Sequence, residues 1–178
     1  MRLSRLVDNI LLAQKININA LTLESKPVDL CQLLEESFEE NRMFASERGV
    51  GLSLGNLAQA DIIGDAFAIR QIVDNIVSNA IKFSNNGGVV EGTLMTSSGQ
   101  VKLSITNSGR GIPEGMESQV FGRFEQVENS GQSATQGSGL GLHISKKLAQ
   151  QMSGNIYYES QLGVGTTFHV EFPLADQQ

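Results

Sequence analysis

The segment from Asp65 to Ser84 carries three polar side chains at helical spacing: Asn75, Asn79 and Lys82. At about 100° per residue, these side chains form one stripe along a helix. Two carboxamides and an ammonium are unusual on a solvated helix face, which commonly mixes glutamate, lysine and arginine. An amide oxygen can ligate Mg²⁺, and a lysine can meet phosphate as a point charge. The stripe therefore predicts a site for a magnesium-bound phosphate; the alternative is a surface helix with incidental asparagines.

Three glycine-rich turns occur later in the chain, at residues 107–113, 137–142 and 163–165. Glycine has no Cβ, so the backbone amides around it can approach an anion closely, above all where a helix begins. Gly139 and Gly141 stand at the start of such a predicted helix. Together with the polar stripe, these turns favour a phosphate-binding site. Taken alone, each would also suit an ordinary tight turn between a loop and a helix.

The helices that must position these residues follow from hydrophobic spacing. A helix from Asp29 to about Gly49 begins with a variant of the capping box, in which Gln32 stands three residues after the cap. Another helix is predicted from about residue 140 to Gly154. The central helix, residues 65–84, has an apolar face opposite its polar stripe, formed by Ile69, Ile72, Val73, Ile76, Val77, Ala80 and Ile81.

Strands are predicted at residues 50–57, 61–63, 89–96, 101–106, 156–159 and 166–172, after an extended segment at 21–28. Small polar residues fill 128–137, which we expect to be a mobile lid or binding loop. Residues 1–20 place Leu3, Leu6, Ile10 and Ala13 at alternating steps of three and four, a short coiled-coil-like seam. Helices among hairpin-linked strands predict an α+β fold, with one sheet and helices packed on one face.

Composition narrows the class of protein further. The chain has 178 residues, 40% hydrophobic, with a net charge of −6. The negative charge argues against nucleic acid or anionic lipid as the main partner, and no apolar run is long enough to span a membrane. Cys31 is the only cysteine, so a reducing, cytoplasmic setting is expected. His143 and His169 are interpreted as structural residues.

Five motifs resemble the catalytic, ATP-binding domain of sensor histidine kinases, in the superfamily shared with gyrase, the heat-shock chaperone and mismatch-repair ATPases. Residues 75–83 resemble the N box, 107–112 the first glycine box, 121–124 the F box, 137–142 the second glycine box and 163–168 the closing turn. The resemblance covers residues 21–174 in the family's order. It implies a Bergerat-type ATP-binding fold, a two-layer α/β sandwich with a mixed, mostly antiparallel sheet. The catalytic domain would then be 21–178, and 1–20 would resemble the end of a dimerisation and histidine-phosphotransfer helix.

The resemblance also implies ATP and Mg²⁺ as cofactors. By similarity, Asn79 coordinates Mg²⁺ and Asn75 supports it, Lys82 neutralises phosphate charge, and Arg123 is available to a phosphate; Asn75, Lys82 and Arg123 are thus the expected catalytic residues. Phe121 and Phe124 either anchor the lid or belong to the core. The full set expected to bind the nucleotide is Asn75, Asn79, Lys82, Phe83, Asn107, Gly109, Gly111, Ile112, Phe124, Gly137, Gly139, Leu140, Gly141, Leu142 and Thr166.

The implied reaction is transfer of the γ-phosphoryl group of ATP to a histidine on an upstream dimerisation helix, of the same or a partner chain. The group would then pass to an aspartate of a response-regulator receiver domain. Neither His143 nor His169 matches the acceptor, so this chain alone is not expected to phosphorylate itself. The seam in residues 1–20 would allow two chains to pair. We expect no contact with nucleic acid or membrane in these residues, although a segment outside them could anchor the protein.

Two positions separate the alternative functions. ATP-hydrolysing relatives place a glutamate at position 75 as general base, but Asn75 cannot take a proton, and Asp74 is interpreted as a surface charge. An ATP-driven clamp is therefore disfavoured.

The first glycine box normally opens with an aspartate that accepts a hydrogen bond from adenine, and here it opens with Asn107. A charged hydrogen bond is worth about 1.5–3 kcal/mol and a neutral one about 0.5–1.5 kcal/mol, so ATP binding should be weakened several-fold to about tenfold. The second hypothesis is accordingly a degenerate, kinase-like regulatory module that binds ATP weakly or not at all.

Overall fold

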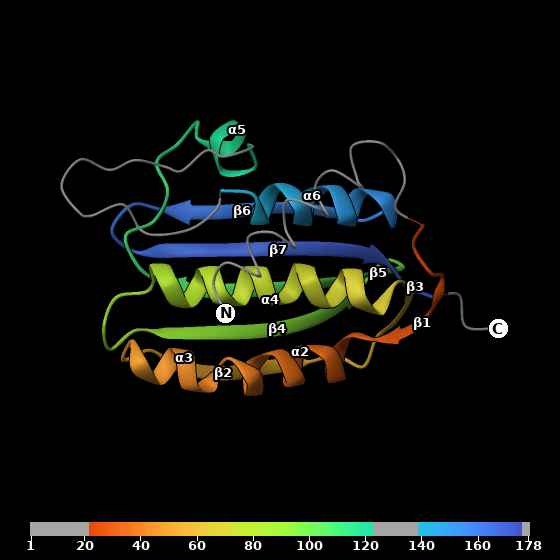
Figure 1. Cartoon of the computed structure of the whole chain (residues 1–178), viewed down its shortest axis with the longest axis horizontal. Helices are drawn as coiled ribbons and strands as arrows, with labels where there is room; N and C mark the ends of the chain where they lie inside the picture. Colours follow the sequence, from red (N-terminus) through yellow and green to blue (C-terminus); the bar gives the residue numbers. More distant parts are fainter. Residues whose placement is uncertain (1–21, 123–138, 176–178) are drawn as a thin grey trace.

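The structure, a computed structural model, describes residues 22–122 and 139–175. The helix predicted within residues 1–20, the loop predicted at 128–137 and three of the expected site residues, Arg123, Phe124 and Gly137, lie outside these ranges. The described chain forms two layers, with helices covering one face of a five-stranded sheet (Figure 1). The expected two-layer α+β fold is confirmed.

The main sheet has the strand order β2-β4-β5-β7-β6. Its strands are β2 (Gly51–Leu57), β4 (Val89–Ser97), β5 (Gln100–Ser108), β6 (Asn155–Gln161) and β7 (Gly165–Pro173). Only β2 and β4 pair in parallel, and the other neighbours are antiparallel. Parallel neighbours cannot be joined by a tight turn, and the chain between β2 and β4 passes through β3 and α4. The sheet is therefore mixed and mostly antiparallel, as expected.

Two short strands form a separate sheet, where one sheet was expected. Strand β1 (Lys26–Asp29) pairs antiparallel with β3 (Asp61–Gly64). Each of these strands leads directly into a helix, and an aspartate caps each helix start: Asp29 accepts from the amide of Gln32, and Asp65 from that of Ala68. The small sheet therefore holds the N-termini of α2 (Leu30–Glu40) and α4 (Ala66–Phe83) side by side.

The helix predicted from Asp29 to Gly49 is broken in the structure. It divides into α2 and α3 (Arg42–Glu47) at Asn41. Asn41 has φ −89° and ψ 0°, away from regular helical values, and its side-chain amide donates to the Ser37 carbonyl that also accepts its backbone amide. Gly49 follows α3 with a φ of +65°, a left-handed conformation that suits glycine.

Helix α4 lies at the centre of the helical layer, between α2 on one side and α6 (Gly141–Gln151) on the other (Figure 1). Its predicted apolar face is completely buried. Opposite it, the sheet contributes Val90, Leu94, Leu103, Ile105, Phe168 and Val170. Short helix α5 (Glu117–Val120) lies beyond the edge of β6. Among the described residues, no helix is both long and apolar enough to cross a membrane.

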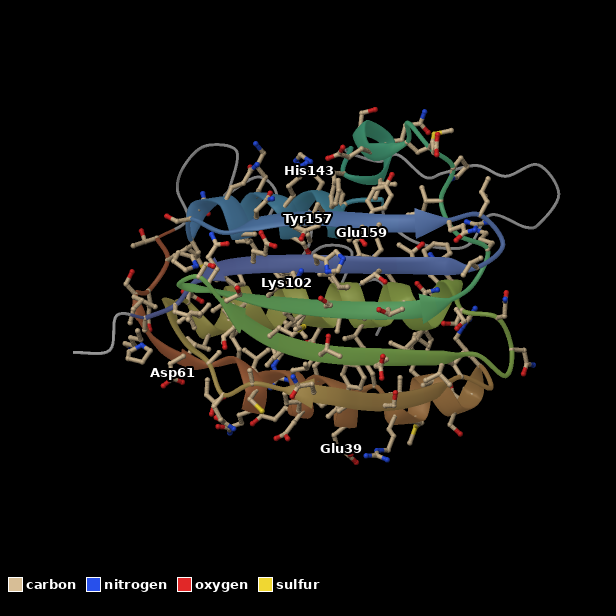
Figure 2. The ribbon with its side chains drawn as sticks, turned by 180° about the vertical axis from the view of Figure 1, so that it is seen from behind. Glu39, Asp61, Lys102, His143, Tyr157 and Glu159 are labelled. Carbon is tan, nitrogen blue, oxygen red and sulfur yellow. The ribbon has the colours of Figure 1, made fainter. Side chains whose placement is uncertain are left out.

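The second face of the main sheet carries polar and charged side chains. Figure 2, drawn from behind, shows Lys102, Tyr157 and Glu159 on the strands in front of the helices. His169 also faces this side, yet only 8% of it is exposed, because the Tyr157 ring lies against it with a centroid distance of 4.9 Å. Its Nδ1 is 2.8 Å from Ser104 Oγ, so this histidine is structural, as interpreted.

Candidate active site

The polar stripe lies on the partly exposed side of α4 rather than in the core. Asn75, Asn79 and Lys82 are all partly exposed, whereas the residues between them on the opposite side are buried. This arrangement follows from the helical period, since burying one apolar face directs residues half a turn away toward solvent. The three side chains thus share one accessible surface, at the spacing that the sequence predicts.

The glycine-rich start of α6 lies against Asn75, the first residue of this stripe. The side-chain amide of Asn75 donates to Ser145 Oγ at 2.9 Å. A Cβ placed on Gly141 would lie 2.2 Å from Asn75 Oδ1, a distance that real Cβ atoms do not adopt. Gly139 has a φ of +63°, which favours glycine. The glycines at 139 and 141 therefore allow the chain to turn into α6 while its backbone approaches the carboxamide of Asn75.

The first glycine turn and the closing turn meet at the C-terminal end of α4. Asn107 is 4% exposed at the end of β5, and a Cβ on Gly165 would lie 2.0 Å from its carbonyl oxygen. Gly109 donates to the carbonyl of Val164 at 3.1 Å, and a Cβ on Gly109 would lie 2.2 Å from the carbonyl of Phe83. Only glycine permits these close approaches, which bring the predicted adenine contact, Asn107, beside the end of the polar stripe.

The neighbouring predicted residues are tied to the outer strands. Thr166 is buried and pairs in register with Asn107, and its hydroxyl is 2.7 Å from Ser160 Oγ. The amide of Ile112 donates to the same Ser160 hydroxyl at 2.8 Å. Gly111 has a φ of +73°, and a Cβ there would meet the carbonyl of Gln161 at 2.2 Å. The loop after β5 is therefore fixed to β6 through Ser160, a contact that the sequence did not reveal.

Positive charge collects around Phe83. Lys82 Nζ and Arg110 Cζ lie 5.0 and 5.1 Å from the centroid of the Phe83 ring, and Arg48 donates to the carbonyl of Lys82 at 3.1 Å. Burial lowers the pKa of Lys82, and the positive charges of Arg48 and Arg110 lower it further. An anion bound here would reverse this effect by stabilising the ammonium. Sequence reasoning missed both arginines, although Arg110 stands within the first glycine motif.

Two expectations about individual residues change with the structure. Asp74 is not the surface charge that was expected: it is half-buried and accepts a 2.5 Å hydrogen bond from Ser37 of α2. Leu140 is 2% exposed and its side chain packs in the core, so only its backbone could face a ligand. Phe121 is also buried, against Tyr158 and Phe168, which supports core packing for this ring.

The donor set suits Mg²⁺ held jointly with phosphate. Within the described ranges there is no group of three or more histidine, cysteine, aspartate or glutamate residues that could hold a metal ion. Amide oxygens are hard ligands of the kind that Mg²⁺ accepts, and this ion commonly takes its remaining ligands from water and substrate phosphates. The Asn75 carboxamide lies close against Gly141 at the start of α6, where backbone amides can approach an anion.

Comparison with known families decides the assignment. Residues 64–176 match the family model described as "Histidine kinase-, DNA gyrase B-, and HSP90-like ATPase". The chain belongs to this family. The matched range includes α4, both glycine turns and the closing turn, whereas Arg48 precedes it. The resemblance to the catalytic, ATP-binding domain of sensor histidine kinases is confirmed.

Relatives of this ATPase domain among characterised proteins are much longer histidine kinases. Histidine protein kinase 1 of Candida albicans is 36% identical over 171 residues, which are 93% of this chain and 7% of that protein. Signal transduction histidine-protein kinase BarA of Escherichia coli K12 is 33% identical over 177 residues, 95% of this chain and 19% of that protein. The chain thus spans at most about a fifth of these two relatives.

Solved structures share the fold of the ATPase domain. Full-length ShkA in complex with AMPPNP aligns with a TM-score of 0.85 and 30% identity, covering 98% of this chain and 36% of that one. The mycobacterial sensor histidine kinase MprB aligns with a TM-score of 0.75 and 28% identity, covering 86% of this chain and 99% of that one. The alignment with MprB thus includes almost the whole of that chain.

Proposed function

We propose that this domain binds Mg-ATP along α4 and donates its γ-phosphoryl group to a histidine on a dimerisation helix of its own or a partner chain. A receiver domain of a response regulator then takes the phosphoryl group onto an aspartate. The observation that carries the proposal is the partly exposed stripe of Asn75, Asn79 and Lys82, in which Asn75 lies against the glycine-rich start of α6. Its relatives named as histidine kinases support the same reaction class, and the ShkA structure was obtained with an ATP analogue.

Each part of the site has a distinct task in this proposal. Asn79 and Asn75 offer amide oxygens to Mg²⁺, which when bound neutralises charge on the phosphates. Lys82 and the backbone around Gly139 and Gly141 hold the phosphates, and Asn107 accepts a hydrogen bond from adenine. Arg123 would meet a phosphate from outside the described residues. A neutral imidazole is already a competent nucleophile, so the domain mainly aligns the phosphoryl group and stabilises its charge.

The structure offers no general base at α4 for an ATP-hydrolysing clamp. Asn75 cannot accept a proton, and the carboxylate next to it, Asp74, points to the opposite flank of the helix and accepts from Ser37. The Asp74 carboxylate is thus already hydrogen-bonded to Ser37. Phosphoryl transfer to an external histidine remains the reaction that this site favours.

A regulatory module with weak ATP binding is the second candidate, and Asn107 is its support. The carboxamide is 4% exposed at the end of β5, so its hydrogen bonding to adenine is sheltered from water. Loss of charge assistance costs about 1 kcal/mol by comparison of charged and neutral bonds, which weakens binding without abolishing it. The kinase assignment therefore takes precedence.

We place the domain in the cytoplasm, paired with a second chain through residues 1–20.

Calorimetric titration with ATP, in the presence and absence of Mg²⁺, tests the proposal on this chain and on Asn107→Asp. We expect saturable binding that depends on Mg²⁺ and tightens several-fold in Asn107→Asp. In a second step, radiolabelled ATP and a separately supplied histidine-phosphotransfer domain should give an acid-labile phosphoprotein. Binding restored only by Asn107→Asp would favour the regulatory module. Absence of binding by both chains would overturn the nucleotide assignment.

A further inference from the structure

A fully buried serine on α6 fixes the carboxamide of Asn75. Ser145 is 0% exposed, and its Oγ accepts a hydrogen bond from Asn75 Nδ2 at 2.9 Å. It stands four residues after Gly141, so the two residues lie one above the other on the same face of α6. Both therefore face Asn75: Ser145 accepts its hydrogen bond, and Gly141, which has no side chain, allows its carboxamide to lie close to the helix.

The two ends of a carboxamide are chemically opposite. Its oxygen can ligate a cation, whereas its NH₂ group can only donate and would repel one. With Nδ2 engaged by Ser145, Oδ1 of Asn75 is directed to the first turn of α6, where a Cβ on Gly141 would lie 2.2 Å away. In the opposite amide orientation, the Ser145 hydroxyl would have to donate to Oδ1 instead of accepting from Nδ2. The bond in the structure, from Nδ2 to Ser145 Oγ, fixes the Asn75 side chain against α6 and leaves Oδ1 on the side of Gly141.

We propose that Ser145 is a positioning residue for Asn75, holding Oδ1 in place to receive Mg²⁺ at the start of α6. This inference rests on the proposed function, because it requires that Mg-ATP binds along α4. A positioning partner of this kind can change metal affinity by about ten- to a hundredfold when it is removed. Ser145 itself has no direct contact with nucleotide or metal in this proposal.

A second buried serine provides a matched control. Ser37 is also 0% exposed, lies on the other neighbouring helix, α2, and donates to the α4 residue that precedes Asn75, namely Asp74. The two serines therefore have the same burial, and each hydrogen-bonds one of two adjacent residues of α4, Ser145 as acceptor and Ser37 as donor. They differ in whether their partner belongs to the proposed metal site.

The experiment measures the Mg²⁺ dependence of ATP binding by calorimetry for this chain and for Ser145→Ala, Ser145→Cys and Ser37→Ala. We expect both Ser145 variants to lower the apparent affinity of the ATP complex for Mg²⁺ about tenfold, with ATP binding in EDTA unchanged. Cysteine fills the site of the hydroxyl but accepts hydrogen bonds only weakly, so it separates loss of the bond from loss of volume. Thermal unfolding of each variant confirms that the chain is folded. Ser37→Ala should retain the original Mg²⁺ dependence.

A double-variant comparison decides whether Ser145 acts through Asn75. In an Asn75→Ala background, Ser145→Ala should cause no further loss of Mg²⁺ dependence, because the positioned group is gone. The same loss in both backgrounds would show a merely structural effect and overturn the inference. Unchanged Mg²⁺ dependence in both Ser145 variants would also overturn it, while leaving the proposed function intact. Failure of the unaltered chain to bind Mg-ATP would instead overturn the proposed function itself.

Discussion

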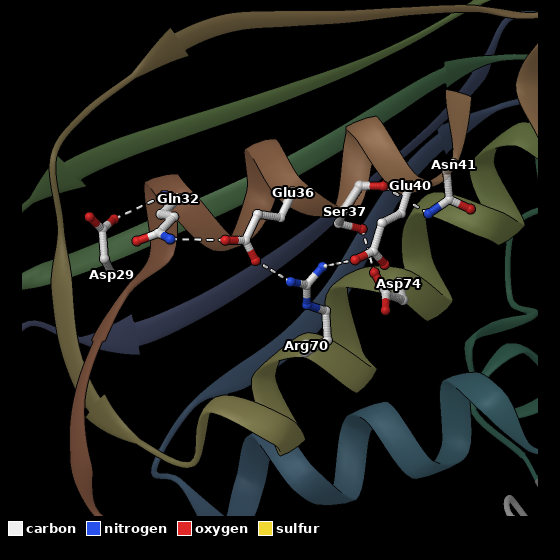
Figure 3. A network of polar contacts seen from close by, with 8 residues as sticks. All are labelled: Asp29, Gln32, Glu36, Ser37, Glu40, Asn41, Arg70 and Asp74. Carbon is white, nitrogen blue, oxygen red and sulfur yellow. Dashed lines mark hydrogen bonds and ion pairs between the residues drawn. The ribbon is translucent and has the colours of Figure 1, made fainter. Parts of the chain in front are cut away.

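The two flanks of α4 are built from different chemistry. On the α2 side the contacts are charged: Arg70 forms ion pairs with Glu36 and, at 3.5 Å, with Glu40, and Asp74 accepts from Ser37 (Figure 3). On the α6 side the contacts of Asn75 are with an uncharged hydroxyl and with a glycine. One helix thus directs Arg70 and Asp74 to one neighbour and Asn75 to the other.

The difference shows how one helix can be both scaffold and site. On the α2 flank, Arg70 is paired with Glu36 and Glu40, and Asp74 accepts from Ser37, so these charged groups have partners within the protein. On the α6 flank, the stripe offers carboxamide oxygens and an ammonium, groups that are suited to an incoming metal and phosphate. Variants on the α2 flank should therefore change stability, and variants on the α6 flank should change binding.

The largest expected effect follows from Gly141→Ala on the α6 flank. Its Cβ would lie 2.2 Å from Asn75 Oδ1, so the carboxamide must rotate away. We expect a loss of about 100-fold in Mg-ATP affinity, at the upper end of the effect of removing a group that orients a metal ligand, and thermal unfolding shows whether the variant is folded. Gly51→Ala, whose Cβ would meet Val89 at an ordinary 3.4 Å, is the control for calorimetry and should bind normally.

The next largest effect is a loss of stability from a substitution on the α2 flank. Ser37→Ala leaves the half-buried Asp74 carboxylate without this donor, which should lower the free energy of unfolding by about 1–3 kcal/mol. Urea denaturation measures this loss, and Ser53→Ala, at an exposed position in β2, should stay within about 0.5 kcal/mol of the unaltered chain. The comparison of flanks would be wrong if Ser37→Ala weakened ATP binding under conditions where the chain remains folded.

A smaller effect on ATP affinity is expected from a substitution near the C-terminal end of α4, outside both flanks. Asn107→Asp restores a charged acceptor at the predicted adenine contact and should tighten ATP binding several-fold to about tenfold. GTP presents a carbonyl in place of the adenine amino group, so its binding should not tighten. Equal tightening of both nucleotides would show that the added charge acts in some way other than by accepting from adenine.

How far the sequence predicts this molecule depends on the range of each interaction. The bounds of α4 and α6 were predictable because local periodicity and the cap at Asp65 determine them. The break at Asn41 and the pairing of β1 with β3 were not, since propensity along the chain also allows a continuous helix and a single sheet. The bond between Asn75 and Ser145 joins residues on separate helices, and no spacing rule links them. For the same reason Asp74 was misread as a surface charge, because Ser37 is distant in sequence.

The smallest expected effect lies on the open face of the sheet and should be independent of both flanks. Burial lowers the pKa of His169 below 6.5, so below pH 6.5 the unfolded chain binds more protons than the folded chain at this position. Stability should therefore fall as the pH drops from 6.5 toward the folded-state pKa, and be unaffected by this group above 6.5. The groups facing His169 are Lys102, Ser104, Tyr157, Glu159 and Glu171.

Urea unfolding at pH 7.5 and 5.5 measures this dependence. His169→Gln should show a smaller loss of stability between the two pH values than the unaltered chain, and His143→Gln serves as the matched control on the helical layer. An equal loss in the chain and in His169→Gln would assign the pH dependence to other groups. Mg-ATP affinity of His169→Gln at pH 7.5 should equal that of the unaltered chain.

The pairing of β5 with β7 has a consequence for the order in which the molecule can be made. Its rungs run from Gln100 opposite Pro173 to Ser108 opposite Gly165, and the whole of α6 is translated between the two strands. While a ribosome is still synthesising this stretch, α4 and the β4–β5 hairpin already exist, but α4 still lacks its contacts with α6. Closing so long a loop is slow, and the uncovered surface is prone to aggregation or chaperone capture. The proposed site around Asn107 therefore assembles only with the closing strand, because Asn107 pairs with Thr166 of β7, and a nascent chain gains its stabilising ligand at the last step of folding.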